Sequence, residues 1–182
     1  MRIGIDFSQV VYRGTGVATY VRKMVLELAG RDRTNKYVLF GSSLRQREAL
    51  ASFINEIKAV NPTVEAVILP IPLKALHILW NVLHVVPVEW FIGNVDVFWS
   101  SDWTTPPLAR ARGLTTIHDL IVYRNPEYFD PTIVSVQKKR LERAAKEYEA
   151  FLCDSEATMQ DAKAYLSLDA SKLQVVYPGY SQ

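Results

Sequence analysis

Two short stretches of this sequence carry residue types that could do chemistry. In the first, His118 and Asp119 directly follow the apolar, β-branched run 114–117, which predicts a buried strand. Ligands of open α/β sheets bind outside the carboxyl ends of the strands. A histidine there can titrate near neutral pH or donate a hydrogen bond to a hydroxyl group. The alternative is a histidine that only caps the strand end. From its position alone, the two interpretations are about equally probable.

The second stretch is the loop Gly14–Gly16, between the first predicted strand and the first predicted helix. Backbone amides at a helix N-terminus can bind a phosphate, although a tight turn is the more common role for such glycines. The dinucleotide-binding pattern needs a glycine where Thr19 stands and an acidic residue where Gly41 and Ser42 stand. A nicotinamide or flavin site is therefore not expected. A P-loop is not expected either, because no Gly-Lys-Ser/Thr follows.

Strands and helices alternate along the chain. Strands are predicted at residues 2–5, 37–40, 64–69, 95–99, 114–117, 150–153 and 173–176. Helices are predicted at about 17–30, 43–57, 76–83, 131–148 and 155–166, with caps at Ser43 (a capping box with Gln46), Asp130 and Ser155. The stripe of the third helix consists of Leu76, Leu79, Trp80 and Leu83. This order predicts an α/β domain: a Rossmann-like parallel sheet of about seven strands with helices on both faces.

Composition and charge agree with one globular domain. The chain has 182 residues, of which 49% are hydrophobic and 22% charged, and its formal net charge of +2 is too small to indicate a nucleic acid or a lipid surface as a partner. The run Lys138–Arg140 is expected on a solvated helix face. The single cysteine, Cys153, lies in a predicted buried strand, where we expect inert packing and a reducing compartment. We find no signal-peptide pattern and no apolar run that could span a membrane, so we expect a cytoplasmic protein.

Several stretches, taken in order, carry a family resemblance. They are Arg2–Asp6, Gly14–Val17 with Tyr20, Asp96–Trp99, Thr116–Asp119 with Pro126–Phe129, Asp154–Thr158 and Val175–Gly179. Together they resemble the N-terminal half of retaining GT-B glycosyltransferases of family 4. The resemblance implies one half of a GT-B fold, with no cofactor or metal. In such enzymes the N-terminal domain binds the acceptor, here a sugar or lipid-linked molecule, and the C-terminal domain binds the nucleotide-sugar donor.

The resemblance also implies roles for individual residues. His118 would face the transferred sugar and give it a hydrogen bond, and Asp119 would orient the loop that carries His118. The Gly14–Gly16 loop would let the Gly16 amide approach the β-phosphate of the donor, because no side chain intervenes. Three further residues would lie on the rim of the same crevice and hold acceptor hydroxyl groups, with a structural role as the equal alternative: Tyr20, Asp102 and Glu127.

The donor-binding domain of the family has no counterpart in residues 1–182, which we therefore interpret as a single acceptor-side domain. Three origins stay open: a chain cut at the interdomain hinge, half of a split enzyme whose donor domain is a second protein chain, or a relic with a binding role. We expect transferase activity only when a donor domain is present. The alternatives are a non-catalytic Rossmann-like interaction module and, disfavoured by Thr19, a small nucleotide-binding protein.

Two histidines and three tryptophans are further candidates for functional residues, and each has a simpler structural interpretation. His77 and His84 share a helix face, but no carboxylate or thiol joins them at ligand spacing, so a metal site is not expected. The tryptophans are interpreted mainly as core residues: Trp80, Trp90 and Trp99. For Trp90 and Phe91 the second interpretation is a partner surface or a peripheral contact with a membrane edge.

Overall fold

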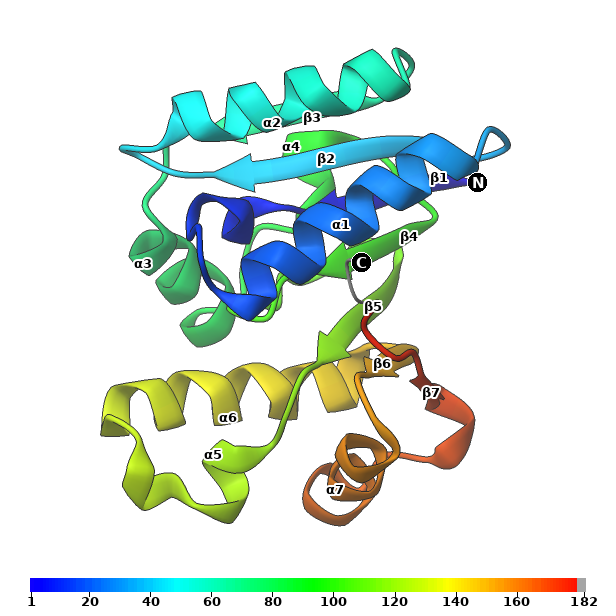
Figure 1. Ribbon diagram of the computed structural model, residues 1–182. Coiled ribbons are helices and arrows are strands. Elements are labelled where there is room, and N and C mark those ends of the chain that lie inside the picture. The colour runs from blue at the N-terminus through cyan, green and yellow to red at the C-terminus, as the bar shows by residue number, and fades with distance from the viewer. Residues whose placement is uncertain (180–182) are drawn as a thin grey trace.

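The computed structural model describes residues 1–179 and contains one seven-stranded sheet (Figure 1). Its strands are β1 (Arg2–Asp6), β2 (Lys36–Ser42), β3 (Glu65–Leu69), β4 (Val97–Ser100), β5 (Arg112–Ile117), β6 (Ala150–Cys153) and β7 (Leu173–Val175). They lie in the order β3-β2-β1-β4-β5-β6-β7, and every neighbouring pair is parallel. The predicted Rossmann-like sheet is confirmed, and each predicted strand end lies within two residues of the observed one.

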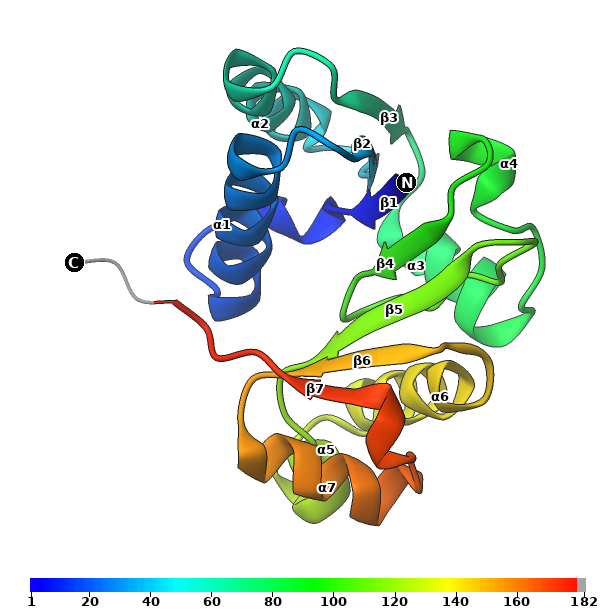
Figure 2. The same ribbon diagram turned by 90° about the vertical axis from the view of Figure 1, so that its right-hand side faces the viewer.

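Helices cover both faces of the sheet, as predicted (Figure 2). One face carries η1 (Ser8–Val11), α1 (Gly16–Arg31) and α2 (Arg47–Val60). The other carries α3 (Leu73–Leu76), the π-helix η2 (His77–Val82), α4 (Glu89–Ile92) and α6 (Pro131–Glu147), with α7 (Glu156–Leu166) beside β6 and β7. Five short elements were not predicted: η1, α4, α5 (Ile121–Arg124), η3 (Pro126–Tyr128) and η4 (Ala170–Lys172).

Two of the three predicted N-caps, Asp130 and Ser155, are confirmed at the starts of α6 and α7. The Asp130 carboxylate accepts from the Thr132 amide at 2.7 Å, and the Ser155 hydroxyl accepts from the Thr158 amide at 3.1 Å. The prediction that Ser43 caps the second helix was wrong, because the helix begins four residues later. The Ser43 hydroxyl accepts from the Gln46 amide, but this bond closes a turn before α2, which begins at Arg47.

β1 and β4 pair with each other at the centre of the sheet, and the strand order reverses between them. The loops that leave the carboxyl ends of these strands run apart, and such a switch point is where open α/β sheets bind ligands. The loop after β1 leads to α1. The loop after β4, residues 101–111, reaches β5 without a helix. Several of its residues are nevertheless buried, so their backbone polar groups need partners within the protein.

Arg140 supplies one of these partners, which corrects the prediction of a solvated run at Lys138–Arg140. Only 3% of Arg140 is exposed. Its guanidinium donates to the Ser101 carbonyl and to the Thr115 hydroxyl, both at 3.3 Å. The prediction failed because Arg140 lies on the buried stripe of α6 beside Leu141, where a hydrogen-bonded guanidinium replaces an apolar side chain.

The third helix also differs from its prediction. The backbone amide of Leu83 donates to the carbonyl of Ile78, five residues earlier, at 2.8 Å. This π-type bond adds a residue to the turn and rotates the following side chains around the axis. As a result Leu76 and Trp80 are buried as predicted, whereas Leu83 is 61% exposed.

We predict opposite effects for two glycine substitutions. A Cβ at Gly113, in β5, would overlap the fully buried ring of Tyr148, so Gly113→Ala should lower the free energy of unfolding by about 1–3 kcal/mol. Gly30→Ala, inside α1, meets only Val60 Cγ1 at 3.4 Å and should raise it by about 0.5–1 kcal/mol. Urea unfolding of both variants measures the difference. Equal stability of the two variants would contradict this account of the β5–α6 packing.

Candidate functional site

His118 lies beside Asp154 at the carboxyl edge of the sheet. β5 and β6 pair in parallel with Ile117 opposite Cys153, so the next residue of each strand, His118 and Asp154, also meet. His118 Nδ1 is 2.7 Å from Asp154 Oδ2. The sequence analysis placed Asp154 in a motif but missed this pairing. The available signal was that both residues directly follow a predicted strand.

Three neighbouring elements hold His118 in place. Although His118 follows the end of a strand at the edge of the sheet, only 19% of its side chain is exposed. Its carbonyl accepts from the Thr158 hydroxyl at 3.2 Å. The edge of the Tyr20 ring packs on the imidazole, with ring centroids 5.0 Å apart and planes at 86°. With Nδ1 at Asp154, Nε2 is the ring nitrogen left for a ligand.

Tyr20 connects α1 to this histidine. Its ring also makes an edge contact with Trp99 in β4, at a centroid distance of 6.2 Å. The Tyr20 hydroxyl is buried and has no hydrogen-bond partner within residues 1–179. Burial raises the pKa of Tyr20, so the phenol is neutral at physiological pH. A buried, unpartnered hydroxyl next to His118 is a feature that a ligand hydroxyl could satisfy.

The glycine loop borders a hollow of about 700 Å³ along α1. The residues that line this hollow are Gly14, Thr15, Gly16, Thr19, Tyr20, Lys23, Met24, Glu27, Arg31, Pro178 and Gly179. Gly14 has a φ of 87°, a left-handed conformation that favours glycine. Gly16 begins α1, and a Cβ at Gly16 would meet no atom within 4 Å. Packing within residues 1–179 therefore leaves the approach to the first amides of α1 open.

The other predicted residues lie apart from this hollow. Asp119 Oδ1 accepts from the Ile121 amide, the first of α5, at 3.1 Å, and this bond shapes the loop after His118. Glu127 is exposed on η3. Asp102 is half-buried, and its Oδ1 atom has no partner within the described part of the chain. The structure thus brings Gly14, Gly16 and Tyr20 together in the lining of the hollow. His118 packs on the Tyr20 ring but is not part of the lining, and neither are Asp119, Glu127 and Asp102.

The two helix histidines have separate partners. His77 Nδ1 lies 2.9 Å from Asn81 Nδ2, and His84 Nε2 lies 2.7 Å from Glu147 Oε2. The sequence analysis missed Glu147, because it comes from α6. Within residues 1–179, no three His, Cys, Asp or Glu side chains form a group that could hold a metal ion.

A family model described as Glycosyltransferase Family 4 matches residues 14–181. The chain belongs to this family. No curated protein matches it significantly. Membership of this glycosyltransferase family implies sugar-containing substrates in general. The matched range includes the glycine loop, Tyr20, His118 and Asp154. None of the helices in the described range, 1–179, is long and apolar enough to cross a bilayer.

We predict that Tyr20→Phe keeps or raises the free energy of unfolding of this family 4 domain. The substitution removes a buried hydroxyl that has no partner within residues 1–179 and retains the ring that packs on His118. The matched control is Tyr148→Phe, which removes a buried bond to the Pro106 carbonyl and should cost about 1–2 kcal/mol. Urea unfolding compares the two. A larger loss for Tyr20→Phe would show that its hydroxyl is already bonded in the free protein.

Proposed function

We propose that this chain is the acceptor-side domain of a retaining glycosyltransferase, which moves a sugar from a nucleotide-sugar to an acceptor. The donor would be held mainly by a second Rossmann-like domain, C-terminal to these residues or on a second chain. One observation carries the proposal: the His118 ring is fixed between Asp154 and Tyr20, with Tyr20 extending to the hollow at the glycine loop. Membership of the family supports it.

Glycosyl transfer builds positive charge on the sugar ring and negative charge on the leaving diphosphate. The N-terminus of α1 suits the second of these charges. The first amides of a helix have no acceptor within the helix, and they carry the positive end of its dipole. The Ala18 amide already donates to the Thr15 hydroxyl at 3.2 Å, and Gly16 leaves the approach to the two preceding amides open. The side chain of Lys23, two helical turns further along, adds a cation to the same hollow. A diphosphate bound there would be stabilised as its charge develops.

His118 suits contact with the transferred sugar. Asp154 fixes the ring through Nδ1, so Nε2 is presented to a substrate. When the ring is neutral with its proton on Nδ1, Nε2 accepts a hydrogen bond from a sugar hydroxyl, and when the ring is doubly protonated, Nε2 donates. In both states Asp154 acts as a positioning residue, because it sets which nitrogen is available and where it points.

The acceptor contacts are proposed for two of the buried oxygens that lack partners within residues 1–179. Tyr20 and Asp102 each carry one, on α1 and in the loop after β4. Asp119 orients the His118 loop through its bond to the Ile121 amide. Glu127, exposed on η3, stays a candidate for the outer rim of the crevice.

A second candidate is a non-catalytic interaction module, which the 75% exposed side chain of Trp90 favours. An assay of nucleotide-sugar turnover separates the two functions. We expect transfer only when the chain is combined with a donor domain, whether fused or added in trans. Absence of transfer with every donor domain tried, together with capture of a partner through Trp90, would favour the interaction module. Robust transfer by residues 1–182 alone would exclude the need for a second domain.

In the assembled enzyme, His118→Ala should lower kcat about 100-fold or more, the usual loss when one contact to the reacting group is removed. It should also lower the free energy of unfolding by about 1–3 kcal/mol, because it leaves the Asp154 carboxylate without its bond. Turnover must therefore be expressed per folded molecule, with the folded fraction taken from circular dichroism. Normal turnover per folded molecule would assign His118 a structural role.

Asp154→Asn should lower kcat about ten-fold with a small change in KM, because the amide no longer fixes the His118 tautomer. It should also shift the pH profile of kcat, which a merely structural role would not do. Asp161→Asn is the matched control, since Asp161 pairs with Arg124 on the surface. An unchanged pH profile in Asp154→Asn would contradict the positioning role.

A further inference from the structure

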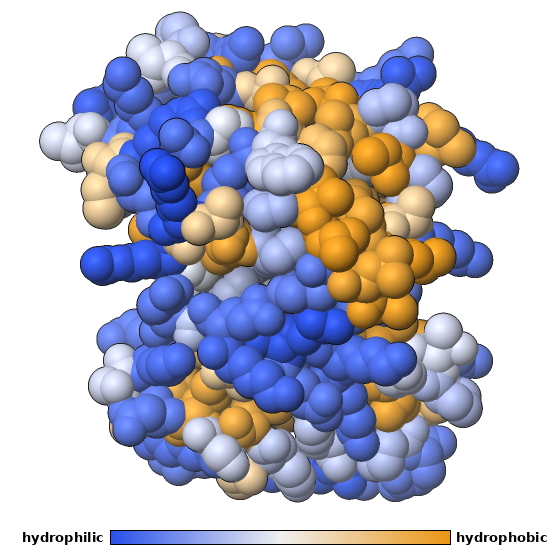
Figure 3. Space-filling view, turned by 180° about the vertical axis from the view of Figure 1, so that it is seen from behind, coloured by the Kyte–Doolittle hydropathy of each residue, from blue (hydrophilic) through white to orange (hydrophobic). Residues whose placement is uncertain are grey.

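Five large apolar side chains are exposed between η2 and α4. We call these residues the apolar face: Ile78, Val82, Leu83, Val85 and Trp90. Figure 3 shows apolar surface gathered over α3, η2 and α4, bordered by a hydrophilic band in the region of α6. Scattered exposed apolar side chains are ordinary, but a gathered patch rimmed by polar residues marks an interaction site.

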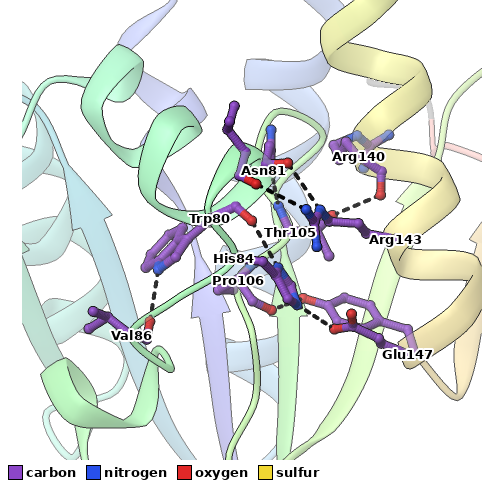
Figure 4. Close-up of polar contacts among 11 residues, drawn as sticks. Trp80, Asn81, His84, Val86, Thr105, Pro106, Arg140, Arg143 and Glu147 are labelled. Atoms are coloured by element: carbon purple, nitrogen blue, oxygen red, sulfur yellow. Dashed lines mark hydrogen bonds and ion pairs between the residues drawn. The ribbon is translucent and has the colours of Figure 1, made fainter.

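The backbone under the apolar face is held in an unusual conformation. His84 and Val86 have φ angles of 54° and 65°, and a left-handed backbone is rare for a β-branched residue such as Val86. The Trp80 indole donates to the Val86 carbonyl at 3.0 Å, and His84 Nδ1 lies 2.9 Å from the Trp80 carbonyl (Figure 4). Strain of this kind persists where surrounding contacts enforce it, and it concentrates at functional sites together with π-helical turns.

A basic hollow of about 400 Å³ adjoins the apolar face, between η2 and α6. Its lining residues are Asn81, Val82, Lys139, Glu142, Arg143, Lys146 and Glu147. Three of them, Lys139, Arg143 and Lys146, follow at helical spacing on one side of α6. Arg143 donates to the Asn81 and Val82 carbonyls and so ties α6 to the π-helix. Lys139 and Lys146 are exposed and form no ion pair within residues 1–179.

The two carboxylates of the hollow do not cancel this charge. Glu147 faces the His84 ring, whose other nitrogen faces the Trp80 carbonyl. Glu147 therefore already has a partner, His84 Nε2, at 2.7 Å. Glu142 is then the one acidic group of the lining that faces three cations.

We propose that the apolar face and the basic hollow together dock this chain on the surface of an anionic phospholipid bilayer. Lipid phosphates would occupy the basic hollow, and the apolar face would enter the boundary between headgroups and acyl chains. Tryptophan and aliphatic side chains suit that boundary, and clustered lysines are attracted to anionic lipids. This docking concerns a surface outside the glycine-loop hollow and does not depend on the proposed catalytic function.

Charge favours a bilayer over a second copy of the chain as the occupant. Two copies that buried the apolar face against each other would bring Lys139 and Lys146 of one copy toward cations of the other. An anionic bilayer places opposite charge at the same positions. The surface also combines both signals that stable peripheral binding requires, a buried apolar part and a basic part.

Sedimentation of the full chain with lipid vesicles tests the proposal. We expect binding to phosphatidylcholine vesicles that contain phosphatidylglycerol, and at least about ten-fold weaker binding to phosphatidylcholine alone. The double substitution Leu83→Ser with Trp90→Ser should weaken binding to the anionic vesicles about ten-fold or more. Lys139→Glu with Lys146→Glu should abolish the preference for phosphatidylglycerol. All four side chains are exposed, so the melting temperature should stay unchanged.

Matched controls lie on α2, on the opposite face of the sheet. Val60→Ser and Lys58→Glu alter an exposed apolar and an exposed basic residue there and should leave vesicle binding unchanged. Lack of binding to anionic vesicles would overturn the proposal. So would concentration-dependent dimerisation that Leu83→Ser and Trp90→Ser abolish, since it would make a second copy the occupant. Binding that glycerol phosphate displaces and that ignores the apolar substitutions would identify a site for free phosphate and overturn it as well.

Discussion

The buried connection between β4 and β5 imposes the constraint on which the rest of this structure depends. Residues 101–111 cross the protein without a helix, so their polar groups must be satisfied by side chains. Carbonyls of the connection accept from Arg140 at Ser101, Asn81 at Trp103 and Tyr148 at Pro106, and Glu89 Oε1 accepts from the amides of residues 109, 110 and 111. The partners come from η2, α4 and α6, so a single loop fixes three helices on one face of the sheet.

Glu89 shows how such a partner remains charged while buried. Burial pushes the pKa of its carboxyl upward, but the amides of residues 109–111 outweigh burial, and the net effect lowers the pKa. The carboxylate is therefore an anion under physiological conditions, held by three donors at 2.9–3.0 Å. Since Glu89 begins α4, these bonds also fix the turn that carries Trp90 outward.

The sequence predicted what local patterns encode. The strands were found because short β-branched runs such as 114–117 alternate with helical stripes, and the starts of α6 and α7 were found because Asp130 and Ser155 cap locally. Contacts between distant elements were not found. The pairing of His118 with Asp154 requires β6 beside β5, which sequence order alone does not prescribe. The burial of Arg140 requires the loop that it bonds, and the rotation of Leu83 requires the π-type bond.

Asn81 connects the loop after β4 to the apolar face. From the π-helix its amide donates to the Trp103 carbonyl at 2.8 Å, and its Oδ1 accepts from the Thr105 amide at 2.9 Å. On the other side of the same loop, the Thr104 hydroxyl donates to Asp6, the buried last residue of β1, at 3.4 Å. The loop therefore joins the switch point of the sheet to the turn that exposes Val82 and Leu83. A surface that binds these side chains would also fix the orientation of the carboxyl edge of the sheet, because the intervening contacts are buried and leave the two regions little freedom to rotate independently.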